Sequence, residues 1–136
     1  MTGVVLTNLT QRIKEVIDTP AKLDSILIYF EVYGENPPFK GGCPLLDAAI
    51  EVDDTDIILK EVVSIIMLII QAGITSVINQ GLERNQLMNI SDPAIYATLI
   101  YSSIEGGVMM MKVIDNDKHL ISVIQYLKND IKNKTA

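Results

Sequence analysis

The stretch Phe39-Lys-Gly-Gly-Cys-Pro-Leu-Leu-Asp-Ala-Ala-Ile-Glu-Val-Asp-Asp54 carries the most information about the fold of this chain. The two glycines predict a turn, because glycine adopts backbone conformations that other residues avoid. Cys43 and Pro44 then open a short helix, where the missing N–H of proline is tolerated. We expect that helix to end in acidic residues and to bury four apolar side chains, those of Leu45, Leu46, Ala49 and Ile50.

The composition indicates one domain with an aliphatic core. At 136 residues the chain is long enough to bury a core, and five Tyr, two Phe and no Trp leave that core to aliphatic side chains. A net charge of −6 argues against this chain alone binding a phosphate backbone, which requires clustered Lys and Arg. The single cysteine excludes an internal disulfide and a cysteine-rich zinc site. Together with a first segment that does not resemble a signal peptide, it favours a cytoplasmic protein.

One segment is long enough to be weighed as a membrane span. Residues 62–82 contain no formal charge, and a stretch of this length can cross a bilayer. Polar side chains interrupt it, namely Ser64, Gln71, Thr75, Ser76, Asn79 and Gln80. A helix buried in the middle of a soluble bundle is the favoured interpretation, because its apolar residues cover more than one face.

The spacing of apolar residues predicts an all-α chain of about six helices in an orthogonal bundle. A first helix is expected over residues 4–17, and Thr19-Pro20 caps and opens a second that reaches Tyr33. The short helix over 44–53 is followed by a long one from Thr55 or Asp56 to about Leu82. Ser91-Asp-Pro93 opens a helix that continues to residue 114, and Asp115-Asn-Asp117 caps the last one.

Three motifs together resemble the C-terminal domain of TetR-family transcription regulators. The first is Lys40-Gly-Gly-Cys-Pro-Leu-Leu46 with its acidic end, Glu51-Val-Asp-Asp54. The second is the long helix that closes near Gly81-Leu82-Glu83. The third is Ser91-Asp-Pro93 followed by Ile104-Glu-Gly-Gly-Val-Met-Met-Met111. The resemblance covers essentially residues 1–136 and implies a single effector-binding and dimerisation domain.

The resemblance also implies what this sequence lacks. Such regulators begin with a three-helix DNA-binding head that contains a helix-turn-helix, whereas residues 1–17 correspond to the helix that connects the head to the rest. We therefore expect operator DNA to be bound only through a missing N-terminal domain, either because the sequence is a fragment or because the natural protein has lost its head.

The helix over residues 93–114 carries two apolar stripes, although a helix that serves only a monomer core needs one. We expect the second stripe to pack with the last helix against a second copy, as a four-helix interface about a twofold axis. The alternative is that both stripes are covered within one chain. The predicted interface consists of Leu99, Ser102, Ser103, Gly106, Met109, Met110, Val113, Leu120, Ile124 and Leu127.

The family binds small apolar or aromatic effectors among its middle helices, which implies a pocket here. The predicted lining is Tyr29, Phe30, Tyr33, Phe39, Cys43, Met67, Gln71, Ile104 and Val108. Each of these residues has plain core packing as its alternative. Gln71, polar within an apolar helix, needs either backbone carbonyls or a ligand as its partner. Glu105 is expected to pair through Lys112 or Tyr101, or to cap a ligand amine.

No catalytic residue, metal site or cofactor is predicted. The sequence contains one His and one Cys, too few for the usual zinc motifs. Cys43 near a helix start leaves two other functions open: a redox switch and a small helical hydrolase. A further alternative is a headless interaction protein that forms heterodimers with an intact regulator.

Overall fold

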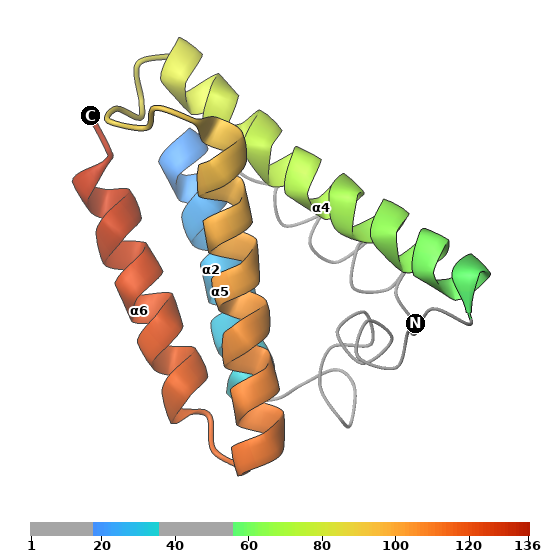
Figure 1. The fold of residues 1–136 in the computed structure, drawn as a ribbon. Coiled ribbons are helices and arrows are strands. Elements are labelled where there is room, and N and C mark those ends of the chain that lie inside the picture. Colours follow the sequence, from blue (N-terminus) through green and yellow to red (C-terminus); the bar gives the residue numbers. More distant parts are fainter. Residues whose placement is uncertain (1–17, 36–55) are drawn as a thin grey trace.

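The computed structural model describes residues 18–35 and 56–136, and within these ranges the chain forms four helices and no strand (Figure 1). They are α2 (Thr19–Glu35), α4 (Ile57–Glu83), α5 (Pro93–Ile114) and α6 (Lys118–Asn133). All four were predicted, with ends that differ by a few residues at most. The helices expected over 4–17 and 44–53, and the turn at Gly41-Gly42, lie outside the described residues.

Short polar side chains set where two of these helices begin. Asp56 caps α4 by accepting a hydrogen bond from the N–H of Leu59 (3.0 Å). Asp92 caps α5 by accepting from the N–H groups of Ala94 (3.0 Å) and Ile95 (3.2 Å), with Pro93 as the first helical residue. An N-cap carboxylate satisfies backbone donors that have no partner in the first turn. The predicted starts of α4 and α5 are confirmed.

The structure corrects the predicted cap of α2 and identifies the capping residue of α6. At α2 the cap is Asp18, which accepts from the N–H of Ala21 (3.2 Å), and Thr19 is already the first helical residue. At α6, Asp117 makes no side-chain cap, and Asn116 Oδ1 accepts from the N–H of Lys118 instead (2.8 Å). At α2 the capping oxygen comes from the residue before the predicted one, and at α6 it comes from within the predicted capping segment Asp115-Asn-Asp117.

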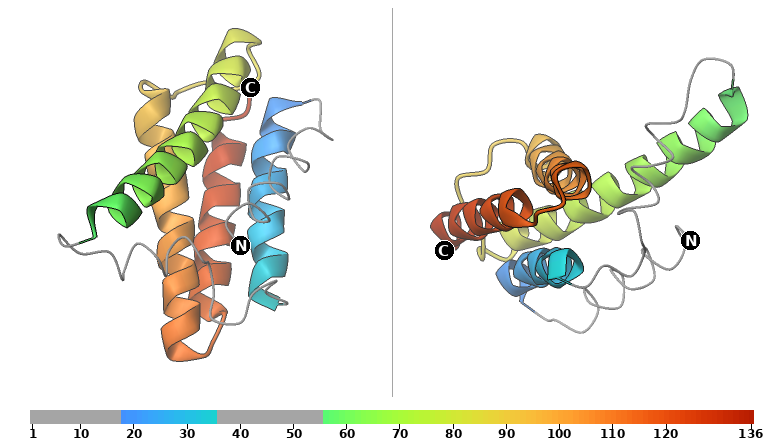
Figure 2. Two further views of the ribbon diagram at one scale, coloured as in Figure 1. Left: turned by 90° about the vertical axis from the view of Figure 1, so that its right-hand side faces the viewer. Right: turned by 90° about the horizontal axis from the view of Figure 1, so that it is seen from below.

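Three of the helices pack side by side and the fourth crosses them. α5 and α6 run antiparallel, and α2 lies behind them in Figure 1, parallel to α5. α4 crosses at an angle, and its C-terminal part lies against α5 and α2 while its N-terminal half extends beyond the other helices (Figure 2). The C-terminus lies beside the loop between α4 and α5, where Leu87 and Thr135 form an isolated antiparallel bridge.

The core lies where these helices meet, and its residues follow the helical spacing of the sequence. Each helix contributes one buried face. The core residues are Leu23, Ile26 and Leu27 of α2; Val63, Ile74, Val77 and Ile78 of α4; Ala97, Ile100, Tyr101, Ile104 and Val108 of α5; Leu120, Ile124, Leu127 and Ile131 of α6; and Leu87.

The close approach of α5 and α6 requires a glycine. A Cβ placed on Gly107 would lie 3.0 Å from Leu120 Cδ1 and 3.1 Å from Leu120 Cα. The second of these atoms belongs to the backbone, so it cannot move aside by rotation of a side chain. Gly107 therefore allows the start of α6 to pack directly on the backbone of α5.

The sequence predicts that α4 is buried in the middle of the fold, but its N-terminal half is not. Only one face of α4 is buried, and the N-terminal half exposes large apolar side chains, among them Ile58, Ile65, Leu68 and Ile69.

By length and composition α4 and α5 are both apolar enough to cross a membrane, but this is weak evidence, because the core helices of soluble proteins pass the same test.

Candidate functional site

The outer face of α5 is an apolar stripe exposed along the whole helix. Its large members, Ile95, Leu99, Met109, Met110 and Val113, are between 36% and 76% exposed. Ser102 and Gly106 lie between them at helical spacing, and a Cβ on Gly106 would meet no described residue within 4 Å. We call these seven residues the α5 stripe. Ser103, also predicted for the interface, is half-buried.

The structure places the predicted α6 members of the interface elsewhere. Leu120, Ile124 and Leu127 are between 0% and 4% exposed in the single chain, because they form the face of α6 that packs into the core. These side chains are not available to a second copy. The exposed aromatic residue of α6 is Tyr126, at 71%, which was not predicted; its signal in the sequence is an aromatic ring on the polar face of an amphipathic helix.

A polar cluster joins the start of α5 to the end of α6. The hydroxyl of Tyr96 donates to Asp130 Oδ2 (2.7 Å), and Lys134 Nζ lies 3.0 Å from Asp130 Oδ1 and 5.1 Å from the centre of the Tyr96 ring. Burial raises the pKa of Tyr96, and its bond to Asp130 raises it further. Burial also acts to raise the pKa of Asp130, but the hydrogen bonds from Tyr96 and Lys134 outweigh it and leave this pKa below its ordinary value.

The structure describes the side chains of five of the predicted pocket residues. Ile104 and Val108 of α5 belong to the core, and Tyr29 of α2 and Met67 of α4 are half-buried against it. Gln71 lies apart from them. Its Nε2 donates to the carbonyl of Ala94 (3.0 Å) and lies 3.5 Å from Thr98 Oγ1. A backbone carbonyl, one of the two expected partners for this amide, is therefore what Gln71 contacts.

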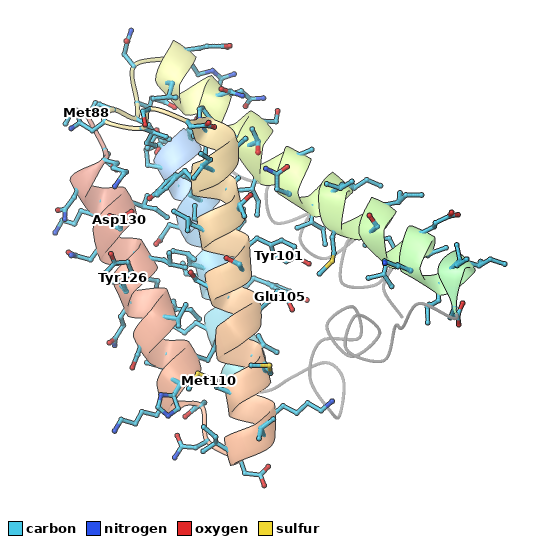
Figure 3. The ribbon with its side chains drawn as sticks, viewed as in Figure 1. Met88, Tyr101, Glu105, Met110, Tyr126 and Asp130 are labelled. Atoms are coloured by element: carbon cyan, nitrogen blue, oxygen red, sulfur yellow. The ribbon has the colours of Figure 1, made fainter. Side chains whose placement is uncertain are left out.

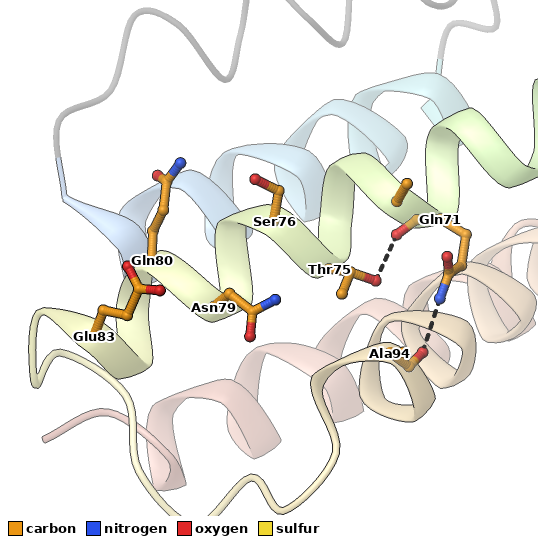
Figure 4. A pocket seen from close by; sticks show the side chains of 8 residues that line it. Gln71, Thr75, Ser76, Asn79, Gln80, Glu83 and Ala94 are labelled. Carbon is orange, nitrogen blue, oxygen red and sulfur yellow. Dashed lines mark hydrogen bonds between the residues drawn. The ribbon is translucent and has the colours of Figure 1, made fainter.

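Gln71 borders a shallow open groove of about 440 Å³ (Figure 4). Its lining is mostly polar, and Thr75 is held by a hydrogen bond from its hydroxyl to the Gln71 carbonyl (2.8 Å). The remaining residues that line it are Ala72, Ser76, Asn79, Gln80, Glu83 and Ala94. This is not the apolar wall expected for the effector pocket.

Two further residues of α5 face the side on which α4 extends. Tyr101 and Glu105 are one turn apart and both are buried, at 9% and 8% exposure. Figure 3 shows both side chains pointing away from α6, below α4. The Glu105 carboxylate and the Tyr101 phenol are the polar groups on this side of α5, among apolar neighbours. An apolar site with a few placed polar groups is typical of ligand pockets.

The structure does not describe the side chains of the other four predicted pocket residues. Phe39 and Cys43 lie outside the described residues, and so do the side chains of Phe30 and Tyr33, whose backbone belongs to α2. Within the ranges that the structure describes, no group of three or more His, Cys, Asp or Glu side chains is arranged to hold a metal ion.

Known proteins resemble both the sequence and the fold of this chain. Residues 19–127 match the family described as "Tetracyclin repressor-like, C-terminal domain". A TetR transcriptional regulator from Chloroflexus aurantiacus J-10-FL is 27% identical with a TM-score of 0.90, over 98% of this chain and 68% of that one. No curated protein matches the sequence significantly.

Two more distant solved structures share the fold. The TetR-family regulator from Cytophaga hutchinsonii is 23% identical with a TM-score of 0.86, over 98% of this chain and 67% of that one. E. coli NemR in its reduced form is 18% identical with a TM-score of 0.76, over 99% and 69%. The family match covers most of the sequence, and the fold agrees with it. The chain therefore belongs to the TetR family of transcription regulators, as a C-terminal domain of that family.

Proposed function

We propose that this chain is the effector-sensing and dimerisation domain of a TetR-like transcription regulator. A small apolar or aromatic effector would bind among the middle helices, and operator DNA would be bound by a separate N-terminal head. Regulators of this family are typically cytoplasmic and dimeric, bind small effectors and DNA, and are generally not enzymes. In such a protein effector and operator oppose each other by one coupling free energy, typically about 1–3 kcal/mol.

The exposed α5 stripe is the observation that supports the proposed dimer. Burying a large aliphatic side chain that was fully exposed contributes about 1.5–3 kcal/mol. Five such side chains that are roughly half-exposed would then contribute on the order of 5 kcal/mol from each copy. The stripe carries no formal charge, and small residues at its centre, Ser102 and Gly106, let a second helix approach closely. We place Tyr126 of α6 beside it and leave out Leu120, Ile124 and Leu127.

Paired glycine substitutions test this interface. Gly106 and Gly73 both lie in helices, and a Cβ on either would meet no atom of residues 18–35 and 56–136 within 4 Å, but only Gly106 is in the α5 stripe. Gly106→Glu should leave the fold intact and weaken the dimer about a hundredfold, because two unpaired carboxylates would be buried near the twofold axis at a cost of about 3 kcal/mol. Gly73→Glu should not change the dimer. Light scattering across micromolar concentrations measures both variants.

A monomeric wild-type chain at micromolar concentration would contradict the dimer proposal. So would equal effects of the two glutamate substitutions, since the loss would then not depend on the α5 stripe.

The effector pocket is supported by the buried pair Tyr101 and Glu105 of α5 and by the apolar side chains of α4 that pack against the core. Met67 is half-buried on the core side of α4, whereas its neighbour Leu68 is 63% exposed on another face. A compound that raises the melting temperature of the wild-type domain should therefore lose much of its effect in Met67→Ala and keep it in Leu68→Ala. A compound with the reverse pattern would place the effector site elsewhere, and the absence of any stabilising compound in a broad apolar and aromatic panel would count against effector sensing.

A further inference from the structure

The start of α2 depends on a residue that is far away in the sequence. The first N–H groups of a helix have no partner within it. Here Ala21 donates to Asp18 Oδ2 and Pro20 has no N–H, which leaves the N–H of Thr19. That group donates to Gln86 Oε1 at 3.1 Å, across 67 positions of sequence. The loop between α4 and α5 therefore supplies part of the cap of α2.

Gln86 is itself held between α4 and the C-terminal tail. Its N–H donates to the carbonyl of Gly81 (2.8 Å), and its carbonyl accepts from the N–H of Ala136 (3.1 Å). Two residues on, the N–H of Met88 donates to the carbonyl of Lys134 (2.8 Å). We call Gln86–Met88 together with Lys134–Ala136 the tail latch. It is a two-stranded contact between the α4–α5 loop and the segment that follows α6.

The tail latch is closely packed against the start of α2. Leu87 is 3% exposed and Thr19 is 0% exposed. A Cβ on Gly81 would lie 2.6 Å from both Leu87 Cδ1 and Thr19 Cγ2. Close-packed interiors transmit displacements rather than absorb them. A shift of the tail latch should therefore displace Thr19.

We propose that the tail latch couples the position of α6 to the start of α2, with Gln86 as the positioning residue that joins them. Its regulatory meaning rests on the proposed function. α6 lies beside the proposed dimer face, and residues 1–17, expected to connect to a DNA-binding head, precede α2 directly. A movement of α6 along its axis then reaches the connecting segment through Lys134–Ala136, Gln86 and Thr19, in addition to direct packing of α6 on α2.

Amide hydrogen exchange of Thr19, measured by NMR on the whole chain, tests the coupling. Gln86→Met keeps the length of the side chain and removes the acceptor, so exchange of the Thr19 amide should accelerate about three- to tenfold. Ala136→Pro removes the N–H that donates to the Gln86 carbonyl and should accelerate exchange of the Thr19 amide by at least about threefold. Ala136→Ser keeps that N–H and should leave the rate unchanged.

A second control separates the latch from the direct packing of α6 on α2. Lys128→Met removes the ion pair of Lys128 with Glu31 near the other end of α2 (2.6 Å) and should not change Thr19 exchange. Acceleration of Met88 without acceleration of Thr19 in Ala136→Pro would overturn the proposal. The comparison of Ala136→Pro with Ala136→Ser tests the coupling even if Gln86→Met does not fold.

The oligomeric state of the same samples keeps this test separate from the proposed function. A monomeric chain in which Ala136→Pro still accelerates Thr19 would reject the dimer and support the latch. A dimeric chain in which it does not would reject the latch and leave the dimer in place.

Discussion

Gly81→Ala tests the close packing of α4 against α2 and the α4–α5 loop. The added methyl group would lie 2.6 Å from Leu87 Cδ1, 2.6 Å from Thr19 Cγ2 and 2.8 Å from Leu87 Cγ. Both neighbouring side chains are almost fully buried, so neither can rotate into solvent. Overpacking of this kind costs about 1–3 kcal/mol. Replacing glycine by alanine within a helix returns about 0.5–1 kcal/mol.

The expected net result is a loss of roughly 0.5–2 kcal/mol in the free energy of unfolding. Gly73→Ala is the matched control, because Gly73 lies in the same helix and a Cβ there would meet nothing within 4 Å in the part of the chain that the structure describes. It should stabilise the domain by about 0.5–1 kcal/mol through helix propensity alone. Urea denaturation at one fixed protein concentration measures both, since the stability of a dimer depends on concentration. If Gly81→Ala proved as stable as Gly73→Ala, the described packing of Leu87 and Thr19 on Gly81 would be refuted.

Two further substitutions follow from the polar groups of the core and its edge. Thr19→Val should stabilise the domain by about 1 kcal/mol in the same urea assay, because the Thr19 hydroxyl is buried and has no hydrogen-bond partner among the described residues; destabilisation would show that the hydroxyl is satisfied. Asp130→Asn should lower stability by about 1 kcal/mol at pH 7. The pKa of Asp130 is depressed in the folded state, so its contribution is present above the ordinary pKa of about 4 and is lost as pH falls through the folded value. The difference between Asp130→Asn and wild type should therefore shrink below about pH 4, and a difference that grows on acidification would contradict this assignment.

Helix existence and type could be predicted from the sequence because they depend on local chemistry. The caps Asp56 and Asp92, the latter followed by Pro93, act within one turn of themselves. The start of α2 was misplaced by one residue. Its first N–H is satisfied by Gln86, and a partner 67 positions away leaves no local signal near Thr19.

The site was harder to predict, because apolar periodicity identifies a stripe but not what covers it. The second stripe of α5 was found from its spacing, and it is exposed along the helix. The same spacing predicts Leu120, Ile124 and Leu127 in the dimer interface, but they form the face of α6 that packs on its own chain and so cannot pack on another. Gln71 was chosen for being polar in an apolar run, and its partner proved to be the carbonyl of Ala94. The family resemblance at residues 39–54 falls on the part of the chain that the structure does not describe.

Oxidation of methionines by peroxide tests most directly whether the α5 stripe is the dimer interface. In the single chain Met88, Met109 and Met110 are similarly exposed, at 45%, 41% and 36%, but only the last two lie in the α5 stripe. Figure 3 shows Met88 and Met110 near opposite ends of the molecule. A chain that dimerises through the stripe should oxidise Met109 and Met110 several-fold more slowly than Met88, and dilution to the monomer should remove the difference. Equal oxidation of all three methionines in a sample shown to be dimeric would place the interface elsewhere on the molecule.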